Sequence, residues 1–132
     1  MNAHILIVED HPTNLKLVVQ VLEMDGYLVD QAIDAEQAQE LLQHRLPDLI
    51  LMDIALPGMD GLTLTRLLKA DARLKHIPVV AMTAFAMKGD DRKALDAGCD
   101  GYITKPIDTR KFSQQIATYL RADADRQGRT TP

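Results

Sequence analysis

Residues 49–53 read Leu49-Ile50-Leu51-Met52-Asp53, four large apolar side chains followed at once by an acid. A short apolar run without an internal polar residue is typical of a strand buried on both faces of a parallel sheet. Three other runs share this pattern and also end on side chains suited to phosphoryl chemistry: residues 5–8 before Glu9 and Asp10, residues 79–82 before Thr83, and residues 102–104 before Lys105. These four runs predict the centre of a parallel sheet.

The segments between the runs have helical spacing, so strand and helix patterns alternate five times. A further, more exposed strand is expected at residues 27–30. The fourth helix, over residues 87–97, is expected to be the least stable because it has little apolar surface and contains Gly89. The apolar residues that mark the helices are Leu15, Val18, Val19 and Leu22, then Ala38, Leu41 and Leu42, then Leu64, Leu67 and Leu68, then Ala94 and Leu95, and finally Phe112, Ile116 and Leu120. The alternation predicts an α/β protein.

The 132 residues fit one domain, which we expect to span residues 1–122, with a disordered polar tail at 123–132. The formal net charge of -4 argues against binding to nucleic acid. No apolar run is long enough to cross a bilayer, so membrane insertion is not expected. Cys99 is the only cysteine, so no internal disulfide can form, which favours the reducing cytoplasm as the location. The Cys99 side chain is expected to be a small buried residue.

In parallel sheets of this kind, ligands bind at the edge formed by the carboxyl ends of the strands. The carboxylates of Glu9, Asp10 and Asp53 should therefore meet there, and an all-oxygen cluster of acids suits Mg²⁺. An aspartate in such a site can act as a nucleophile and form an aspartyl phosphate. Lys105 offers a positive charge to phosphoryl oxygens and Thr83 offers a hydroxyl donor.

Each of these residues also has a simpler explanation when it is taken alone. An acidic pair after a strand is most often a solvated loop or a helix cap, and Asp53 before Pro57-Gly58 fits a turn. These explanations do not account for five such residues at the same ends of four strands. The four histidines lack the spacing of metal ligands and are expected at the surface: His4, His11, His44 and His76.

Five segments contain these strand-end residues and the turns around them: Ile7-Val8-Glu9-Asp10, Asp48-Leu49-Ile50-Leu51-Met52-Asp53, Leu56-Pro57-Gly58-Met59-Asp60-Gly61, Met82-Thr83-Ala84 and Tyr102-Ile103-Thr104-Lys105-Pro106. Together they resemble the CheY-like receiver domain of two-component response regulators over residues 4–121. The stretch from Thr83 to Asp90, followed by Gly98-Cys99-Asp100-Gly101-Tyr102, is most similar to DivK-type single-domain regulators. The same stretch occurs in receivers attached to hybrid kinases.

The resemblance implies a (βα)5 doubly wound sheet with strand order 2-1-3-4-5. It implies that Asp53 is the phosphoacceptor, and that Asp10 and Asp53 bind Mg²⁺ directly while Glu9 binds it through water. The backbone carbonyl of Ala55 would complete the metal site. Thr83 and Tyr102 would form the switch pair, with Lys105 contacting the phosphoryl group. The resemblance also implies a cis peptide at Lys105-Pro106. Where many relatives have polar groups beside the site, this chain has the apolar residues Ala55 and Phe85.

The leading functional prediction is a stand-alone bacterial response regulator that receives a phosphoryl group from a histidine kinase or a phosphotransfer protein. It would act as a monomer or weak dimer, without enzyme activity beyond its own phosphorylation and dephosphorylation. It would bind a downstream target through the fourth helix, fifth strand and fifth helix. A phosphorelay carrier or phosphate sink is the alternative. A haloacid dehalogenase-type phosphatase is more distant, since that chemistry needs a second acid where this chain has Ala55.

Overall fold

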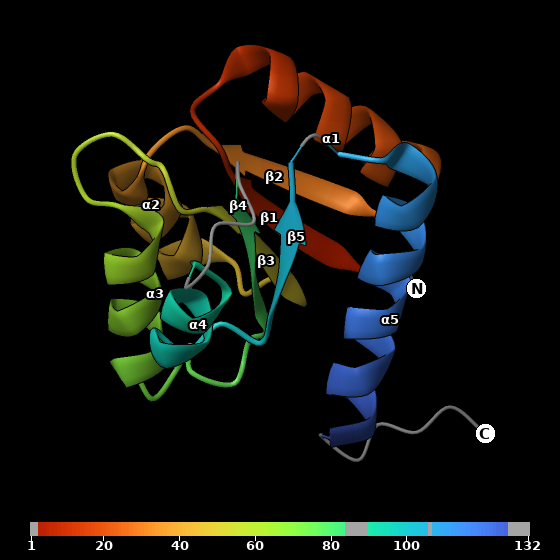
Figure 1. Cartoon of the computed structure of the whole chain (residues 1–132). Coiled ribbons are helices and arrows are strands. Elements are labelled where there is room, and N and C mark those ends of the chain that lie inside the picture. Colours follow the sequence, from red (N-terminus) through yellow and green to blue (C-terminus); the bar gives the residue numbers. More distant parts are fainter. Residues whose placement is uncertain (1–2, 84–89, 106, 127–132) are drawn as a thin grey trace.

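The computed structural model describes residues 3–83, 90–105 and 107–126, within which strands and helices alternate from β1 to α5 (Figure 1). The strands are β1 (His4–Val8), β2 (Leu28–Ala32), β3 (Leu49–Asp53), β4 (Val79–Thr83) and β5 (Gly101–Thr104). The helices are α1 (Pro12–Met24), α2 (Ala35–His44), α3 (Gly61–Ala70), α4 (Asp90–Asp96) and α5 (Thr109–Arg126).

All strand pairs are parallel, and the strand order is β2-β1-β3-β4-β5. The α/β class, the doubly wound architecture and this order are therefore confirmed. The strands β1, β3 and β4 are buried at every position, whereas β2 at the sheet edge is mostly exposed or half-buried. The predicted contrast between apolar central strands and a more exposed second strand is confirmed as well.

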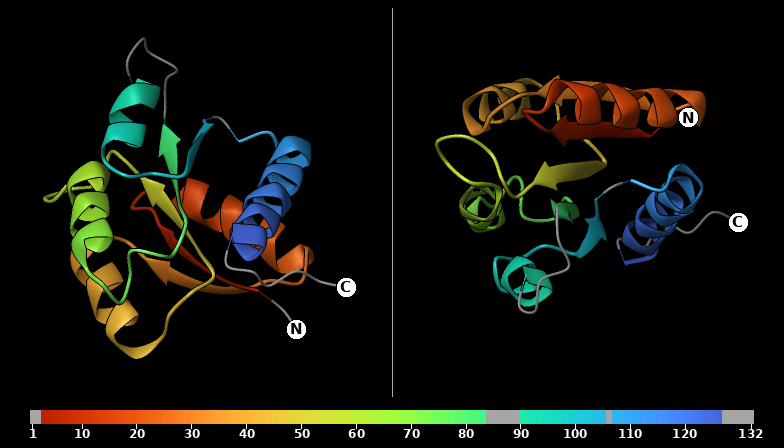
Figure 2. Two further views of the ribbon diagram at one scale, coloured as in Figure 1. Left: turned by 90° about the horizontal axis from the view of Figure 1, so that it is seen from below. Right: turned by 45° about the horizontal axis from the view of Figure 1, so that its top comes forward.

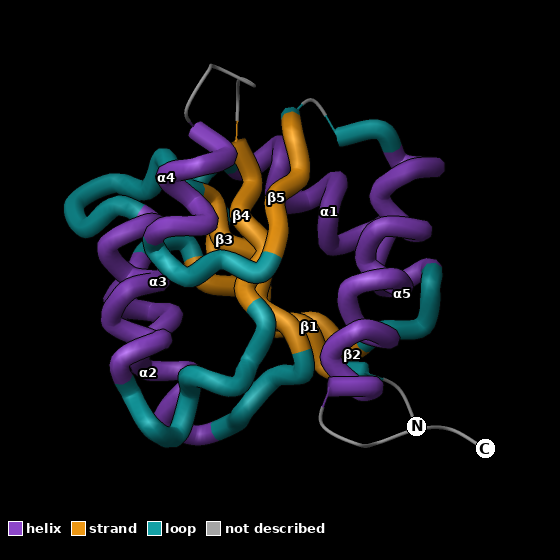
Figure 3. The backbone as a smooth tube through the Cα atoms, turned by 60° about the horizontal axis from the view of Figure 1, so that its bottom comes forward, coloured by secondary structure: helices purple, strands orange, loops and turns teal. Residues whose placement is uncertain are grey.

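The sheet is the middle of three layers: α1 and α5 cover one face and α2, α3 and α4 cover the other (Figures 2 and 3). Alternate residues of each strand point to opposite faces, so the sheet contributes to two apolar cores. One core lies under α1 and α5 and includes Ile7, Leu51 and Phe112. The other lies under α2, α3 and α4 and includes Leu6, Ile50 and Leu64.

Local sequence signals explain where several helices begin and end. Pro12 is in the first turn of α1, where its missing N–H needs no partner. Gly26, which follows α1, has a φ of 89°, a conformation that glycine adopts without strain. Asp34 caps α2 by accepting a hydrogen bond of 2.8 Å from the backbone N–H of Gln37.

The last two helices differ from the expected boundaries. The described part of α4 is Asp90–Asp96, and residues 87–89 of the predicted helix lie outside the described residues. The helix α5 continues to Arg126, four residues beyond the domain boundary expected at Ala122. Residues 123–126 contain neither glycine nor proline, so the helix that begins at Thr109 can continue through them. The rest of the predicted tail, residues 127–132, lies outside the described residues.

Among the described residues, no helix combines the length and the apolar character that crossing a bilayer requires.

Candidate phosphorylation site

The carboxyl edge of the sheet brings together the strand-end residues named from the sequence. Glu9 and Asp10 follow β1, Asp53 ends β3, Thr83 ends β4 and Lys105 follows β5. The registers align these ends, since Val8 pairs with Met52, Asp53 with Met82 and Thr83 with Thr104. Residues up to 96 positions apart in the sequence therefore meet at one edge.

Three carboxylates form the acidic part of this site. One ligand oxygen from each of Glu9, Asp10 and Asp53 lies within 4.8 Å of the other two. Glu9 is fully buried and Asp53 is nearly so, whereas Asp10 is exposed. Like charges at this separation repel one another unless a proton or a cation neutralises them. The donor set, made only of oxygen atoms and open to solvent at Asp10, fits a hard divalent cation such as Mg²⁺.

Lys105 provides the positive charge of the site. Its Nζ donates a hydrogen bond to Glu9 Oε1 at 2.7 Å and lies 3.2 Å from Asp53 Oδ2. The backbone N–H of Lys105 also donates to the carbonyl of Thr83 at 2.6 Å. The ammonium group is therefore held by the two acids, and the Lys105 backbone is held by the neighbouring strand.

Backbone amides fix the two buried carboxylates. The N–H of Ala55 donates to Asp53 Oδ1 at 3.0 Å, so Oδ2 is the oxygen that faces Lys105. The N–H of His11 donates to Glu9 Oε2 at 3.3 Å. His11 makes this contact through its backbone.

The ionisation of the site is unequal between the two buried acids. The pKa of Glu9 is raised to about 7, first by burial and then by Asp53, against the opposing effect of Lys105. Burial also acts to raise the pKa of Asp53. Hydrogen bonds from Glu9 and from the Ala55 amide, together with the charge of Lys105, outweigh burial and lower that pKa. Burial acts to lower the pKa of Lys105, but its contacts with Glu9 and Asp53 raise it. Near neutral pH Asp53 is therefore ionised, whereas Glu9 is ionised in about half of the molecules.

Gly61 is a supporting residue whose role was not identified from the sequence, although it lies in one of the motif segments. A Cβ atom at this position would clash with the backbone of Asp53 and Ile54. The first residue of α3 is therefore packed directly against the strand end that bears the carboxylate. A glycine immediately after the Asp60 helix cap was the available signal, since the cap bond to Thr63 marks the helix start.

The two residues expected to form the switch pair differ in exposure. The Thr83 side chain is buried, at 2% relative exposure, beside the site, whereas Tyr102 on β5 is 39% exposed. Phe85 and Pro106 lie outside the described residues, and with Pro106 the predicted cis peptide. His4 corrects the expectation of surface histidines: it is buried at the start of β1, because Asp30 lies 2.7 Å from its Nε2 and provides a polar partner.

Comparisons with known proteins agree with this geometry. Residues 5–117 match the model of the response regulator receiver domain family. The chain is 45% identical over 120 residues to the polar-differentiation response regulator DivK of Brucella ovis, which covers 91% of this chain and 98% of that protein.

Two solved structures extend the likeness to the fold. The receiver domain of the sensor histidine kinase PA1611 from Pseudomonas aeruginosa has a magnesium ion coordinated in its active-site cleft. It has a TM-score of 0.83 and 32% identity, covering 91% of this chain and 98% of that one. A CheY-like receiver domain protein from Methanospirillum hungatei has a TM-score of 0.85 and 30% identity, covering 96% and 99%. From the family match and the identity to DivK, we conclude that this chain belongs to the response regulator receiver domain family of two-component signalling.

Proposed function

We propose that this chain is a stand-alone response regulator in which Asp53 accepts a phosphoryl group from a histidine kinase or a phosphotransfer protein. The observation that carries the proposal is the contact of Lys105 with both Asp53 and Glu9 across three strand ends. That contact places a compact positive charge against an ionised, nearly buried carboxylate, as phosphoryl transfer requires. We place the protein in the cytoplasm as a monomer or weak dimer.

In the transfer step, Asp53 Oδ2 is the attacking atom, since the Ala55 amide holds Oδ1. A new phosphorus–oxygen bond forms while the phosphorus–nitrogen bond of the donor phosphohistidine breaks, and the leaving imidazole takes up a proton. Lys105 stabilises the negative charge on the phosphoryl oxygens, and the Thr83 hydroxyl donates a hydrogen bond to one of them. The protein contributes to this step by positioning the phosphoryl group and stabilising the charge on its oxygens.

The acidic cluster is the proposed Mg²⁺ site. Asp10 and Asp53 would bind the cation directly, Glu9 through a water molecule, and Ala55 through its backbone carbonyl. The bound cation supplies charge neutralisation at the phosphoryl oxygens. The raised pKa of Glu9 means that the site must release a proton before all three acids are available as anions.

The proposed output is a change in protein binding. Phosphorylation of Asp53 would draw the Thr83 hydroxyl toward the phosphoryl group, and Tyr102 would rotate inward from its exposed position. The binding face would consist of α4, β5 and α5, including Asp91, Tyr102 and Arg110. Lys88, which the sequence also assigns to this face, lies outside the described residues. A shift of a few kcal/mol between two states of this face changes partner affinity by orders of magnitude.

Intact-mass spectrometry tests the acceptor. With Mg²⁺ and a small phosphodonor, the protein is expected to gain one phosphoryl group, and Asp53→Asn is expected to gain none. Asp60→Asn is the matched control, because it makes the same chemical change at the N-cap of the next helix, α3, where asparagine can still cap. Equal phosphorylation of Asp53→Asn would overturn the assignment.

Hydrogen exchange tests the output face. Protection is expected to change between Thr83 and Phe112 when the protein is phosphorylated. Changes confined to the surroundings of Asp53 would show that this face is not the output. Mixing the phosphorylated protein with a phosphotransfer protein separates the carrier alternative, since a carrier would lose its phosphoryl group to the partner histidine.

A further inference from the structure

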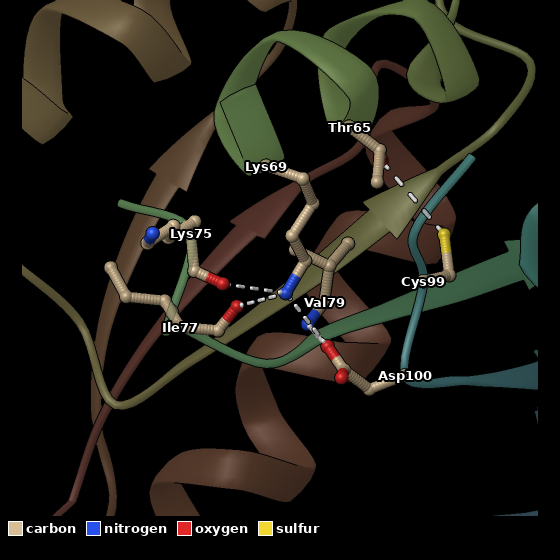
Figure 4. Close-up of polar contacts among 7 residues, drawn as sticks. All are labelled: Thr65, Lys69, Lys75, Ile77, Val79, Cys99 and Asp100. Atoms are coloured by element: carbon tan, nitrogen blue, oxygen red, sulfur yellow. Dashed lines mark hydrogen bonds and ion pairs between the residues drawn. The ribbon is translucent and has the colours of Figure 1, made fainter. Parts of the chain in front are cut away.

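A second polar cluster, drawn in Figure 4, lies at the amino ends of β4 and β5. The acidic site lies at the carboxyl ends of the strands, at the opposite edge of the sheet. Lys69, in the last turn of α3, is at the centre of this second cluster. The Nζ of Lys69 donates to the carbonyl of Ile77 at 2.8 Å, to Asp100 Oδ2 at 3.0 Å and to the carbonyl of Lys75 at 3.3 Å. An ammonium group has three donors, and here each has an acceptor.

Asp100 joins the beginnings of the two strands. Its Oδ2 accepts a hydrogen bond from the backbone N–H of Val79 at 2.8 Å, in addition to the one from Lys69. Its own N–H donates to the carbonyl of Val79 at 2.7 Å. The residue that precedes β5 is therefore attached twice to the first residue of β4, once through its backbone and once through its side chain.

The same cluster attaches the end of α4 to α3. Gly98 has a φ of 105°, and a Cβ atom there would press against Cγ of Lys69, so the lysine stem lies directly over this turn. The N–H of Cys99 donates to the carbonyl of Ala94, and the Cys99 Sγ lies 3.9 Å from the Thr65 hydroxyl. The turn between α4 and β5 is thus fixed to the helix that precedes β4.

Lys69 and Asp100 differ from an ordinary surface ion pair, because the Lys69 ammonium has three acceptors and both side chains are mostly buried. The Lys69 and Asp100 side chains are only 19% and 21% exposed, so water can replace few of these contacts. Removing the ammonium would leave two backbone carbonyls and a carboxylate without this donor in a mostly buried place. The arrangement holds the loop before β4 and the turn before β5 in one relative position.

We propose that Lys69 and Asp100 are positioning residues for phosphoryl transfer, because they fix β4 against β5 and so place Thr83 and Lys105 at the other ends of these strands. The inference rests on the function proposed above. The register aligns Thr83 with Thr104, the residue before Lys105. A slip of one residue along a strand moves a side chain by about 3.3 Å, which is more than a hydrogen bond tolerates.

The proposal predicts a separation between two properties of the site. Glu9, Asp10 and Asp53 lie at the ends of β1 and β3, which Lys69 does not touch in any contact described above. Loss of Lys69 is therefore expected to slow phosphoryl transfer far more than it changes Mg²⁺ affinity, on which Lys105 acts only through its charge. A misplacement of about 1 Å at a reacting group costs about 100-fold in rate, so we expect a loss of about 10- to 100-fold.

The test compares Lys69→Met with Leu42→Ala, a buried core variant of α2, which is the helix that packs against β1 and β2. For both variants, stability is measured by urea titration, Mg²⁺ affinity by titration with the metal alone, and phosphorylation rate at several concentrations of acetyl phosphate. For Lys69→Met we expect a lower maximal rate with a much smaller change in Mg²⁺ affinity, together with faster exchange of the Lys105 amide. For Leu42→Ala we expect lower stability without either effect.

A maximal rate in Lys69→Met within twofold of the wild type would overturn the inference, as would equal losses of rate and Mg²⁺ affinity. If Lys69→Met does not fold, Lys69→Arg is measured in the same way. Its planar guanidinium cannot direct donors at the same three acceptors, so the same selective loss is expected. If wild type itself takes up no phosphoryl group, the proposed function fails, and that outcome is distinct from failure of the Lys69 role.

Discussion

Magnesium affinity is expected to fall about tenfold when the pH is lowered from 8 to 6, because Glu9 must lose its proton when the cation binds. The folded-state pKa of Glu9 is raised to about 7. At pH 8 about 90% of Glu9 would be ionised, and at pH 6 about 10%. The ratio of these two ionised fractions corresponds to about 1.3 kcal/mol of Mg²⁺ binding free energy. Affinity is therefore highest above pH 7 and is lost as the pH falls through 7.

Isothermal titration calorimetry with MgCl₂ at pH 6, 7 and 8 measures this change. Below pH 7, close to one proton should be released for each Mg²⁺ bound, which titrations in buffers of different ionisation enthalpy detect. Glu9→Gln is the matched control, because it keeps the size of the side chain and removes the ionisable carboxyl group. Its affinity is expected to be weaker at pH 8 and nearly independent of pH. Equal affinity of the wild type at pH 6 and pH 8, or an unchanged slope in Glu9→Gln, would refute the reasoning.

In the metal-free protein, Glu9 should contribute stability below its unfolded pKa of 4.5 that is lost as the pH rises through 7, and urea titration of Glu9→Gln should lack that fall. Gly61→Ala should destabilise the fold by about 1–3 kcal/mol, because its Cβ meets the Asp53 backbone, and an unchanged urea midpoint would contradict this. The phosphorylated wild type should decay slowly, because the apolar Ala55 cannot orient an attacking water. Ala55→Asn should therefore speed loss of the phosphoryl group about tenfold, and a wild-type half-life of only seconds would contradict this. Burial raises the pKa of the Cys99 thiol, so labelling by a disulfide reagent at pH 7 should be slow in folded protein and prompt in urea; prompt labelling of folded protein would disprove it.

The sheet could be predicted from the sequence because its central strands have a simple cause. A strand covered by helices on both faces contains no polar residue, as in Leu49-Ile50-Leu51-Met52, and such runs are visible without a structure. The convergence of Asp53, Thr83 and Lys105 followed from one further fact, that parallel strands end at the same edge. The assignment of roles within the site came from the family resemblance.

What could not be predicted depends on contacts between distant residues. The burial of His4 is possible only because the carboxylate of Asp30, on the neighbouring strand, lies 2.7 Å from its Nε2. Nothing near Lys69 in the sequence indicates that Asp100, 31 residues later, accepts a hydrogen bond from its ammonium group. The continuation of α5 to Arg126 was missed for a different reason, since a polar composition was taken as disorder although alanine and arginine favour helix.

The contact between Lys105 and Glu9 has a consequence for how the protein is made. Proteins leave the ribosome from the amino terminus, so the first strand and its acid emerge well before the lysine 96 residues later. Until then Glu9 and Asp53 have no ammonium beside them, and their burial is opposed by their charges. Formation of the site is therefore expected to be a late event in synthesis, and a nascent chain that stops before Lys105 should not be a phosphate acceptor. Competence to receive a signal would in this way report that the whole sheet has assembled.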